Sequence, residues 1–148
     1  MKIAVYCSAK DRIPEEYLSL GDTLGKWIAE DGHTLVYGGA TGGLMTRVSN
    51  AAKAAGGIVE GVIPQRIIQA KRMADNCDTL YVVSNMCERK QKMKELNLVH
   101  YAIAADSGLV TRNWISELSL VLRGEDIIET QSFDLEKDNV YIMAYVTP

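Results

Sequence analysis

The chain has 148 residues, of which 47% are hydrophobic and 24% are charged, and its formal net charge is −3. This length suits a single domain, residues 1–148, with its own hydrophobic core. The slight acidic excess argues against nucleic acid or an anionic membrane surface as a partner, because both attract basic proteins. No apolar run approaches the roughly 18 residues of a membrane-spanning helix, and the N-terminus lacks the layout of a signal peptide.

The three cysteines, Cys7, Cys77 and Cys87, do not follow the spacing of a metal site. Their odd number, and the positions of two of them in predicted regular elements, favour reduced thiols such as those of the cytoplasm. We therefore expect a cytoplasmic protein that binds no metal.

The first predicted element is a buried strand at the apolar run Lys2–Cys7. Pro14 then opens a helix, which Gly32 ends as a C-terminal cap residue. One apolar stripe at helical spacing consists of Tyr17, Leu20, Leu24, Trp27 and Ile28. A second strand at His33–Tyr37 leads into a loop that contains four glycines.

The helix after this loop has an apolar face made of Leu44, Val48, Ala51, Ala52 and Ala55. It stops at Gly56 and Gly57, and a strand at Ile58–Ile63 follows, closed by Pro64. A fourth strand is predicted at Leu80–Val83. These four strands should be neighbours at the centre of one sheet.

A third helix begins with a capping box, in which Asn85 is the N-cap and Glu88 follows three residues later. The elements expected beyond Leu96 are a strand at Tyr101–Ala105, a helix at Trp114–Leu122, a loop at Arg123–Asn139 and a strand at Val140–Val146. Strands that alternate with helices predict an α/β fold. We expect a Rossmann-like, doubly wound parallel sheet with right-handed crossovers.

The loop Tyr37–Met45 has glycines at positions 38, 39, 42 and 43, between a strand and a helix. In open parallel sheets, ligands bind at the carboxyl ends of the strands. Free N–H groups of the loop, together with the positive end of the following helix, would form an anion site, and phosphate is its usual occupant. The alternative is a tight turn that needs small residues for helix–sheet packing.

Two common nucleotide-binding motifs are not present in the sequence. The loop does not read G-x-G-x-x-G, and Glu60 falls inside a strand rather than at a ribose-binding strand end. Gly25 and Lys26 are followed by Trp27 within a helix, so they do not form a Walker A loop. The sequence therefore contains no motif that indicates a nicotinamide-dependent oxidoreductase.

Helical spacing places Met86, Arg89 and Met93 on one face of the third helix. Arg89 falls in its first turn, beside the carboxyl edge of the predicted sheet. An arginine there suits a phosphate or a carboxylate, which it can hold by two parallel hydrogen bonds. The alternative is a solvated basic helix face, and we prefer it for Lys92 and Lys94.

The segments VYGGATGGLM, GGIVEGVIP and MCERKQKM, in this order and spacing, resemble the Lonely Guy family of cytokinin riboside monophosphate phosphoribohydrolases, often mislabelled lysine decarboxylases. The resemblance runs from Met1 to about Leu96. It implies a homodimer of doubly wound subunits, with the helix of Arg89 near the interface. It also implies no cofactor, because this family uses no pyridoxal phosphate.

The activity implied by the resemblance is hydrolysis of the N-glycosidic bond of a nucleoside 5′-monophosphate such as AMP, which releases the base and ribose 5-phosphate. Positive charge develops on the ribose as the base departs. A carboxylate near the sugar and an arginine near the nucleotide therefore suit this reaction.

The phosphate-binding residues that the resemblance implies are Gly38, Gly39, Thr41, Gly42 and Gly43. Ser8 would line the first loop of the site. Arg89 would be the catalytic arginine, with Met86 and Lys90 beside it as further substrate-binding residues.

The family's other signature, Pro-Gly-Gly-x-Gly-Thr followed by paired acids, is altered in this chain, which reads AADSGLVTRNW at 104–114. In the ungapped register Gly108 replaces the last glycine of the signature. The residues at the acid positions are Thr111 and Arg112 in that register, and Asn113 and Trp114 in a register aligned on Thr111. The catalytic carboxylate is missing in both.

Glu117 matches only a later, auxiliary acid, and we keep it as the second catalytic candidate, with Gly108 and Thr111 as substrate-binding candidates. Either the chain is a degenerate family member, or its tail at 97–148 is altered, for example by a frameshift. Two classes of function stay open. The first is an impaired N-ribohydrolase, and the second is a non-catalytic nucleotide- or phosphate-binding protein of the same fold.

Overall fold

The structure is a computed structural model that describes residues 1–13, 15–96, 99–104, 127–132 and 141–146. Its elements are β1 (Lys2–Tyr6), α1 (Glu15–Glu30), β2 (Thr34–Tyr37), α2 (Gly43–Ala54), β3 (Ile58–Pro64), α3 (Gln65–Gln69), β4 (Thr79–Val83), α4 (Met86–Leu96), β5 (Val99–Ala104), β6 (Ile127–Ser132) and β7 (Tyr141–Val146). The predicted helix at Trp114–Leu122 and the candidate residues Gly108, Thr111 and Glu117 lie outside the described residues.

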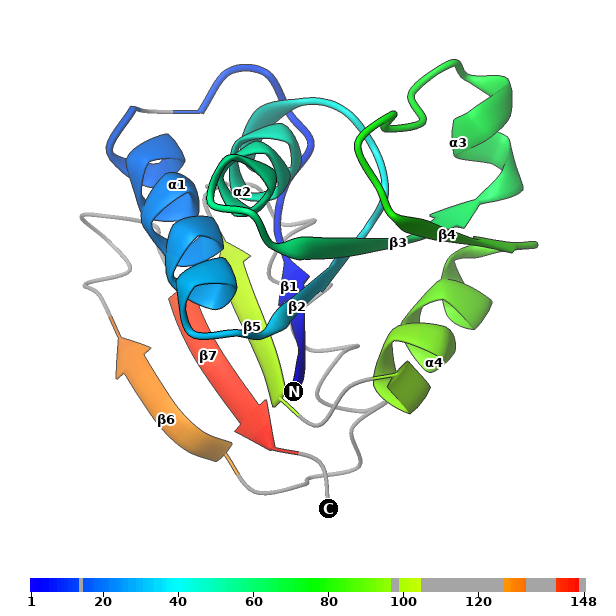
Figure 1. Cartoon of the computed structure of the whole chain (residues 1–148). Helices are drawn as coiled ribbons and strands as arrows, with labels where there is room; N and C mark the ends of the chain where they lie inside the picture. The colour runs from blue at the N-terminus through cyan, green and yellow to red at the C-terminus, as the bar shows by residue number, and fades with distance from the viewer. Residues whose placement is uncertain (14, 97–98, 105–126, 133–140, 147–148) are drawn as a thin grey trace.

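The seven strands form one sheet in the order β4-β3-β2-β1-β5-β7-β6 (Figure 1). Neighbouring strands from β4 to β5 pair in parallel, with Ile3 opposite Leu35 and Leu35 opposite Val59. The predicted α/β fold is confirmed, and the four N-terminal strands are neighbours. β7 pairs antiparallel with both β5 and β6, so the sheet has an antiparallel extension, and β4 lies at its edge rather than at its centre.

Two elements differ from the sequence-based expectation. The charged, aperiodic segment Arg123–Asn139 predicts a loop, but Ile127–Ser132 within it forms β6. Pairing with β7 supplies the backbone hydrogen bonds, and such non-local pairing overrides a weak local pattern. The short helix α3 has only five residues, too few for an apolar periodicity to reveal it.

Side chains alternate across the sheet, so β1, β2 and β3 each contribute to two cores. The core on the side of α1 and α2 includes Ile3, Val5, Leu35, Tyr37 and Val59, together with Ile28 and Leu44. The core on the side of α4 consists of Ala4, Tyr6, Val36, Val62 and Met93. Helices therefore cover both faces of the parallel strands, as Figure 1 shows, and the doubly wound prediction is confirmed.

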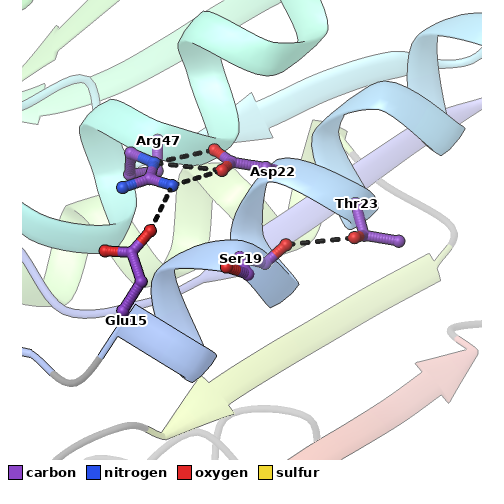
Figure 2. Close-up of polar contacts among 5 residues, drawn as sticks. All are labelled: Glu15, Ser19, Asp22, Thr23 and Arg47. Atoms are coloured by element: carbon purple, nitrogen blue, oxygen red, sulfur yellow. Dashed lines mark hydrogen bonds and ion pairs between the residues drawn. The ribbon is translucent and has the colours of Figure 1, made fainter.

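An ion cluster joins α1 to α2. Figure 2 shows Arg47 of α2 beside two acids of α1: its Nε donates to Asp22 Oδ1 at 2.9 Å and its Nη2 donates to Glu15 Oε1 at 3.1 Å. Trp27 departs from the predicted apolar stripe of α1, because 41% of it is exposed. Its ring packs edge-on against that of His33 instead.

The predicted cap residues Gly32 and Asn85 are confirmed, whereas Pro14, the predicted start of the first helix, lies outside the described residues. Gly32 follows α1 with φ +76°, the left-handed conformation of a glycine C-cap. Before α4, Asn85 Oδ1 accepts the N–H of Glu88 at 2.9 Å, and Glu88 accepts the N–H of Ser84 at 2.8 Å, one residue earlier than in a standard capping box. In the part of the chain that the structure describes, no helix is long and apolar enough to cross a membrane.

Candidate functional site

The strand order reverses at β1, because the chain continues to β2 on one side of it and returns to β5 on the other. Ligands of open parallel sheets bind at such a switch point, beside the carboxyl ends of the strands. Three described segments meet at this edge: the loop after β1, the glycine loop after β2 and the first turn of α4. These three segments are the parts of the candidate site that the sequence predicts.

Arg89, in the first turn of α4, is only 6% exposed. Its Nε donates to the carbonyl oxygen of Val62 in β3 at 2.8 Å, and its Nη2 donates to the carbonyl oxygen of Gly38. Its Nη1 donates to Met86 Sδ at 3.6 Å. The predicted position of Arg89 beside the carboxyl edge of the sheet is confirmed, and its guanidinium contacts Gly38, the first glycine of the loop.

No acidic side chain among the described residues forms an ion pair with Arg89. Burial is the main reason why the pKa of Arg89 is lowered to about 10, and the nearby Arg66 cation lowers it further. The guanidinium therefore stays charged at neutral pH. A buried cation without a carboxylate partner is unfavourable by itself, and it attracts an anion to this edge.

Gly38 makes room for this arginine. A Cβ atom on Gly38 would overlap the Arg89 guanidinium and would lie 2.7 Å from Met45 Cε. A larger residue would displace the guanidinium from its position against the loop. The missing side chain of Gly38 therefore makes room for another side chain of the protein, that of Arg89.

Gly42 is the N-cap residue of α2 and has φ +113°, a conformation that favours glycine. A Cβ atom there would overlap the carbonyl oxygen of Ala9 and would lie 2.6 Å from Arg72 Nη2. Positive φ angles also occur at Gly39 (+65°) and Gly43 (+47°). These contacts support the packing interpretation of the loop, and the phosphate interpretation stays a prediction.

The first turn of α2 has backbone donors that the protein does not use. No side chain caps this helix, and its first turn contains no acid. The N–H of Met45 donates to the carbonyl oxygen of Ser8 at 3.3 Å, but the N–H groups of Gly43 and Leu44 donate to no group of the described residues. Two donors at the positive end of a helix are thus available to an anion.

A model of the SLOG cluster4 family (LDcluster4) matches residues 1–128. The chain belongs to this family. The match extends beyond Leu96, at which the predicted resemblance ends.

Curated relatives of this SLOG cluster4 chain confirm the resemblance to the Lonely Guy family. The cytokinin riboside 5'-monophosphate phosphoribohydrolase of Mycobacterium marinum is 42% identical over 93 residues, which cover 63% of this chain and 49% of the relative. The protein of the same name from Rhodococcoides fascians is 37% identical over 107 residues, which cover 72% of this chain and 54% of the relative. The chain thus spans about half the length of the curated relatives it matches.

A solved structure extends the likeness to a protein of another name. The molybdenum cofactor binding protein from the phototrophic bacterium Rippkaea orientalis superposes with a TM-score of 0.67 at 27% sequence identity. The superposition covers 83% of this chain and 71% of that protein. The SLOG cluster4 chain therefore shares its fold with a protein named for binding a cofactor.

Three other predicted site residues of this SLOG cluster4 chain lie in the two loops at this edge or in α4. Ser8 Oγ accepts the N–H of Lys10 at 3.1 Å, so this hydroxyl closes a turn in the first loop. Thr41 is exposed, and its N–H donates to the carbonyl oxygen of Arg72 at 2.9 Å. Lys90 is 8% exposed and follows Arg89 in α4.

No group of three or more His, Cys, Asp or Glu in the described ranges suits a metal ion.

The segment 70–77, between α3 and β4, is part of the site, but the sequence gives no sign of it. Arg72 Nη2 donates to the carbonyl oxygens of Ala9 at 2.8 Å and of Thr41 at 3.0 Å. The N–H of Ala74 donates to the carbonyl oxygen of Gly39 at 2.9 Å. These bonds join residues far apart in the sequence, so no local motif or spacing reports them.

The solvated interpretation of Lys92 is wrong. Lys92 is half-buried, and its Nζ lies 5.1 Å from the centroid of the Tyr81 ring, a cation–π contact between α4 and β4. Lys94 is half-buried too. Lysine stems pack along apolar surface, and a charge pattern by itself does not show this.

Proposed function

We propose that this edge of the sheet binds a nucleoside 5′-monophosphate such as AMP, and that the protein hydrolyses its N-glycosidic bond slowly or not at all. The phosphate lies over the glycine loop 38–43, against the first turn of α2. The buried Arg89, whose charge no acid of the described residues balances, carries this proposal. The names of the curated relatives support the choice of substrate class.

The proposed impairment follows from the sequence at 104–114, which has no acid where the family signature has its catalytic carboxylate. That acid stabilises charge on the sugar or prepares the attacking water. Removing one such group typically lowers a rate by about two to four powers of ten, whereas binding by other groups survives. The residues that hold the nucleotide, Arg89 and the glycine loop, are kept.

A non-catalytic binding protein of the same fold is the second candidate. The missing carboxylate favours it, and so does the likeness to a solved protein named for cofactor binding. In this case the same phosphate-binding edge would hold a ligand without any chemical step. We also place the protein in the cytoplasm, because Cys7, Cys77 and Cys87 are all free thiols.

The test is an assay of released base after incubation with AMP and with prenylated AMP, with the Mycobacterium marinum relative as a positive control. We expect turnover at least about 100-fold below that of the relative. Introducing an acid by Thr111→Glu or Arg112→Glu, or by Asn113→Glu or Trp114→Glu in the other register, should raise it. Turnover equal to that of the relative, lost on Glu117→Ala, would show that Glu117 is the acid and would overturn the proposed impairment.

A further inference from the structure

Arg72 lies beside the N-terminus of α2, although it comes from the segment between α3 and β4. Its Nη2 donates to the carbonyl oxygen of Ala9 at 2.8 Å and to that of Thr41 at 3.0 Å. The same nitrogen lies 2.6 Å from the place that a Cβ atom on Gly42 would occupy. The guanidinium therefore touches both loops that border the first turn of α2.

Backbone hydrogen bonds fix the position of this side chain. The N–H of Thr41 donates to the carbonyl oxygen of Arg72 at 2.9 Å, and the N–H of Ala74 donates to that of Gly39 at 2.9 Å. An isolated antiparallel bridge pairs Ala40 with Met73 between these bonds. An exposed arginine normally samples many rotamers, but this one is held at both its backbone and one terminal nitrogen, so binding through it loses less entropy.

The rest of the guanidinium is unused by the protein. The two protons of Nη2 serve the two carbonyl oxygens, while Nε and Nη1 donate to no group of the described residues. No acidic side chain in the described ranges forms an ion pair with Arg72. Asp11 Oδ1 lies beside the Arg72 guanidinium, 3.2 Å from the place that a Cβ atom on Gly42 would occupy. Because this carboxylate repels an anion, an anion bound there needs a cation nearby.

We propose that Arg72 is a second arginine of the anion site, which contacts the phosphate group of a bound phosphomonoester through Nε or Nη1 while Nη2 bridges the two loops. This inference rests on the proposed function. A phosphomonoester carries close to two negative charges at neutral pH. Arg89 and Arg72 together match that charge, which selects a nucleoside 5′-phosphate over the corresponding nucleoside.

The test compares AMP and adenosine titrations of the wild type with those of Arg72→Gln, Arg72→Lys and Lys71→Asn. Glutamine keeps an NH₂ group for the carbonyl oxygens but loses the charge, and lysine keeps the charge. Lys71→Asn removes a neighbouring exposed charge, and asparagine tolerates the φ of +58° at that position. Thermal melting shows whether each variant is folded.

We expect Arg72→Gln to weaken AMP binding by about 10- to 100-fold, as for a lost charge-assisted hydrogen bond, with adenosine binding unchanged. Arg72→Lys should bind AMP more tightly than Arg72→Gln, and Lys71→Asn should stay within about threefold of the wild type. Equal AMP affinity of the glutamine and lysine variants, or equal losses for AMP and adenosine, would reduce Arg72 to a bridge between loops. Wild type that binds AMP, with Arg72→Gln unaffected, refutes this inference alone; wild type that does not bind AMP refutes the proposed function as well.

Discussion

Gly38 and Arg89 depend on each other although they lie 51 positions apart in the sequence. The carbonyl oxygen of Gly38 accepts a hydrogen bond from Arg89 Nη2, and the missing side chain of Gly38 leaves the space that the guanidinium fills. The glycine loop and the helix α4 thus form one site through a single pair. The glycine at position 38 and the arginine at position 89 are therefore understood only as a pair.

This pair gives a prediction for the residue scale. Gly38→Ala should lower the free energy of unfolding by about 1–3 kcal/mol, because the new methyl group overlaps the guanidinium. In an Arg89→Ala background the same change should have a clearly smaller effect, since the guanidinium is gone and only the flexible end of the Met45 side chain still lies close to the new methyl group. Urea denaturation of the wild type, both single variants and the double variant measures this coupling. Additive effects would contradict the described contact.

The sequence predicts the place of Arg89 but not its surroundings. Helix periodicity puts Arg89 in the first turn of a helix that starts at a strand end, and this suffices to bring it to the carboxyl edge of the sheet. Its acceptors come from β3 (Val62) and from the loop after β2 (Gly38), so their identity depends on the register of the sheet. The role of Arg72 depends in the same way on an unpredicted crossing of two loops.

At the scale of elements, α1 and α2 are held together by apolar packing and by the cluster of Arg47, Asp22 and Glu15 (Figure 2). Hydrogen bonds from Arg47 lower the pKa of the Asp22 carboxyl group below its usual value. Asp22 is partly exposed, with 42% of its side chain accessible, so solvent screens the pair and its contribution is modest. The α2 helix carries the glycine loop at its start, so this cluster supports the site indirectly.

The lowered pKa of Asp22 predicts a pH dependence. A carboxyl group with a lower pKa in the folded state stabilises the fold above its unfolded pKa, near 3.9, and loses this effect as pH falls through the folded pKa. Asp22→Asn should therefore melt below the wild type at pH 6, and the difference should shrink below about pH 4. Asp75→Asn, at an exposed residue that forms no ion pair within the described residues, serves as the control. A difference in melting temperature that is constant down to about pH 2.5 would rule out this origin.

The strands and long helices of residues 1–96 are the part of the fold that the sequence predicts well, because buried strands and amphipathic helices have distinct periods. The short helix α3 and the strand β6 escape this reasoning. The first has too few residues for a period, and the second depends on pairing with β7 rather than on its own composition. Element type is thus predictable where burial dictates the pattern.

At the scale of the whole molecule, we propose a homodimer with α4 near the interface, as the resemblance to the Lonely Guy family implies. The chain spans about half the length of its curated relatives, so the oligomeric state has to be measured on this chain itself. Light scattering at micromolar concentration should give twice the mass of the 16.3 kDa chain. A monomer would contradict the proposed assembly.

We propose that a phosphate-binding edge persists in this SLOG cluster4 protein while its hydrolytic acid is missing. The most direct test is an equilibrium titration with AMP, after which the same samples are analysed for adenine by chromatography. We predict saturable AMP binding, with adenine release at least about 100-fold slower than that of the Mycobacterium marinum relative under the same conditions. No saturation up to about 1 mM AMP, or adenine release as fast as that of the relative, would contradict the claim.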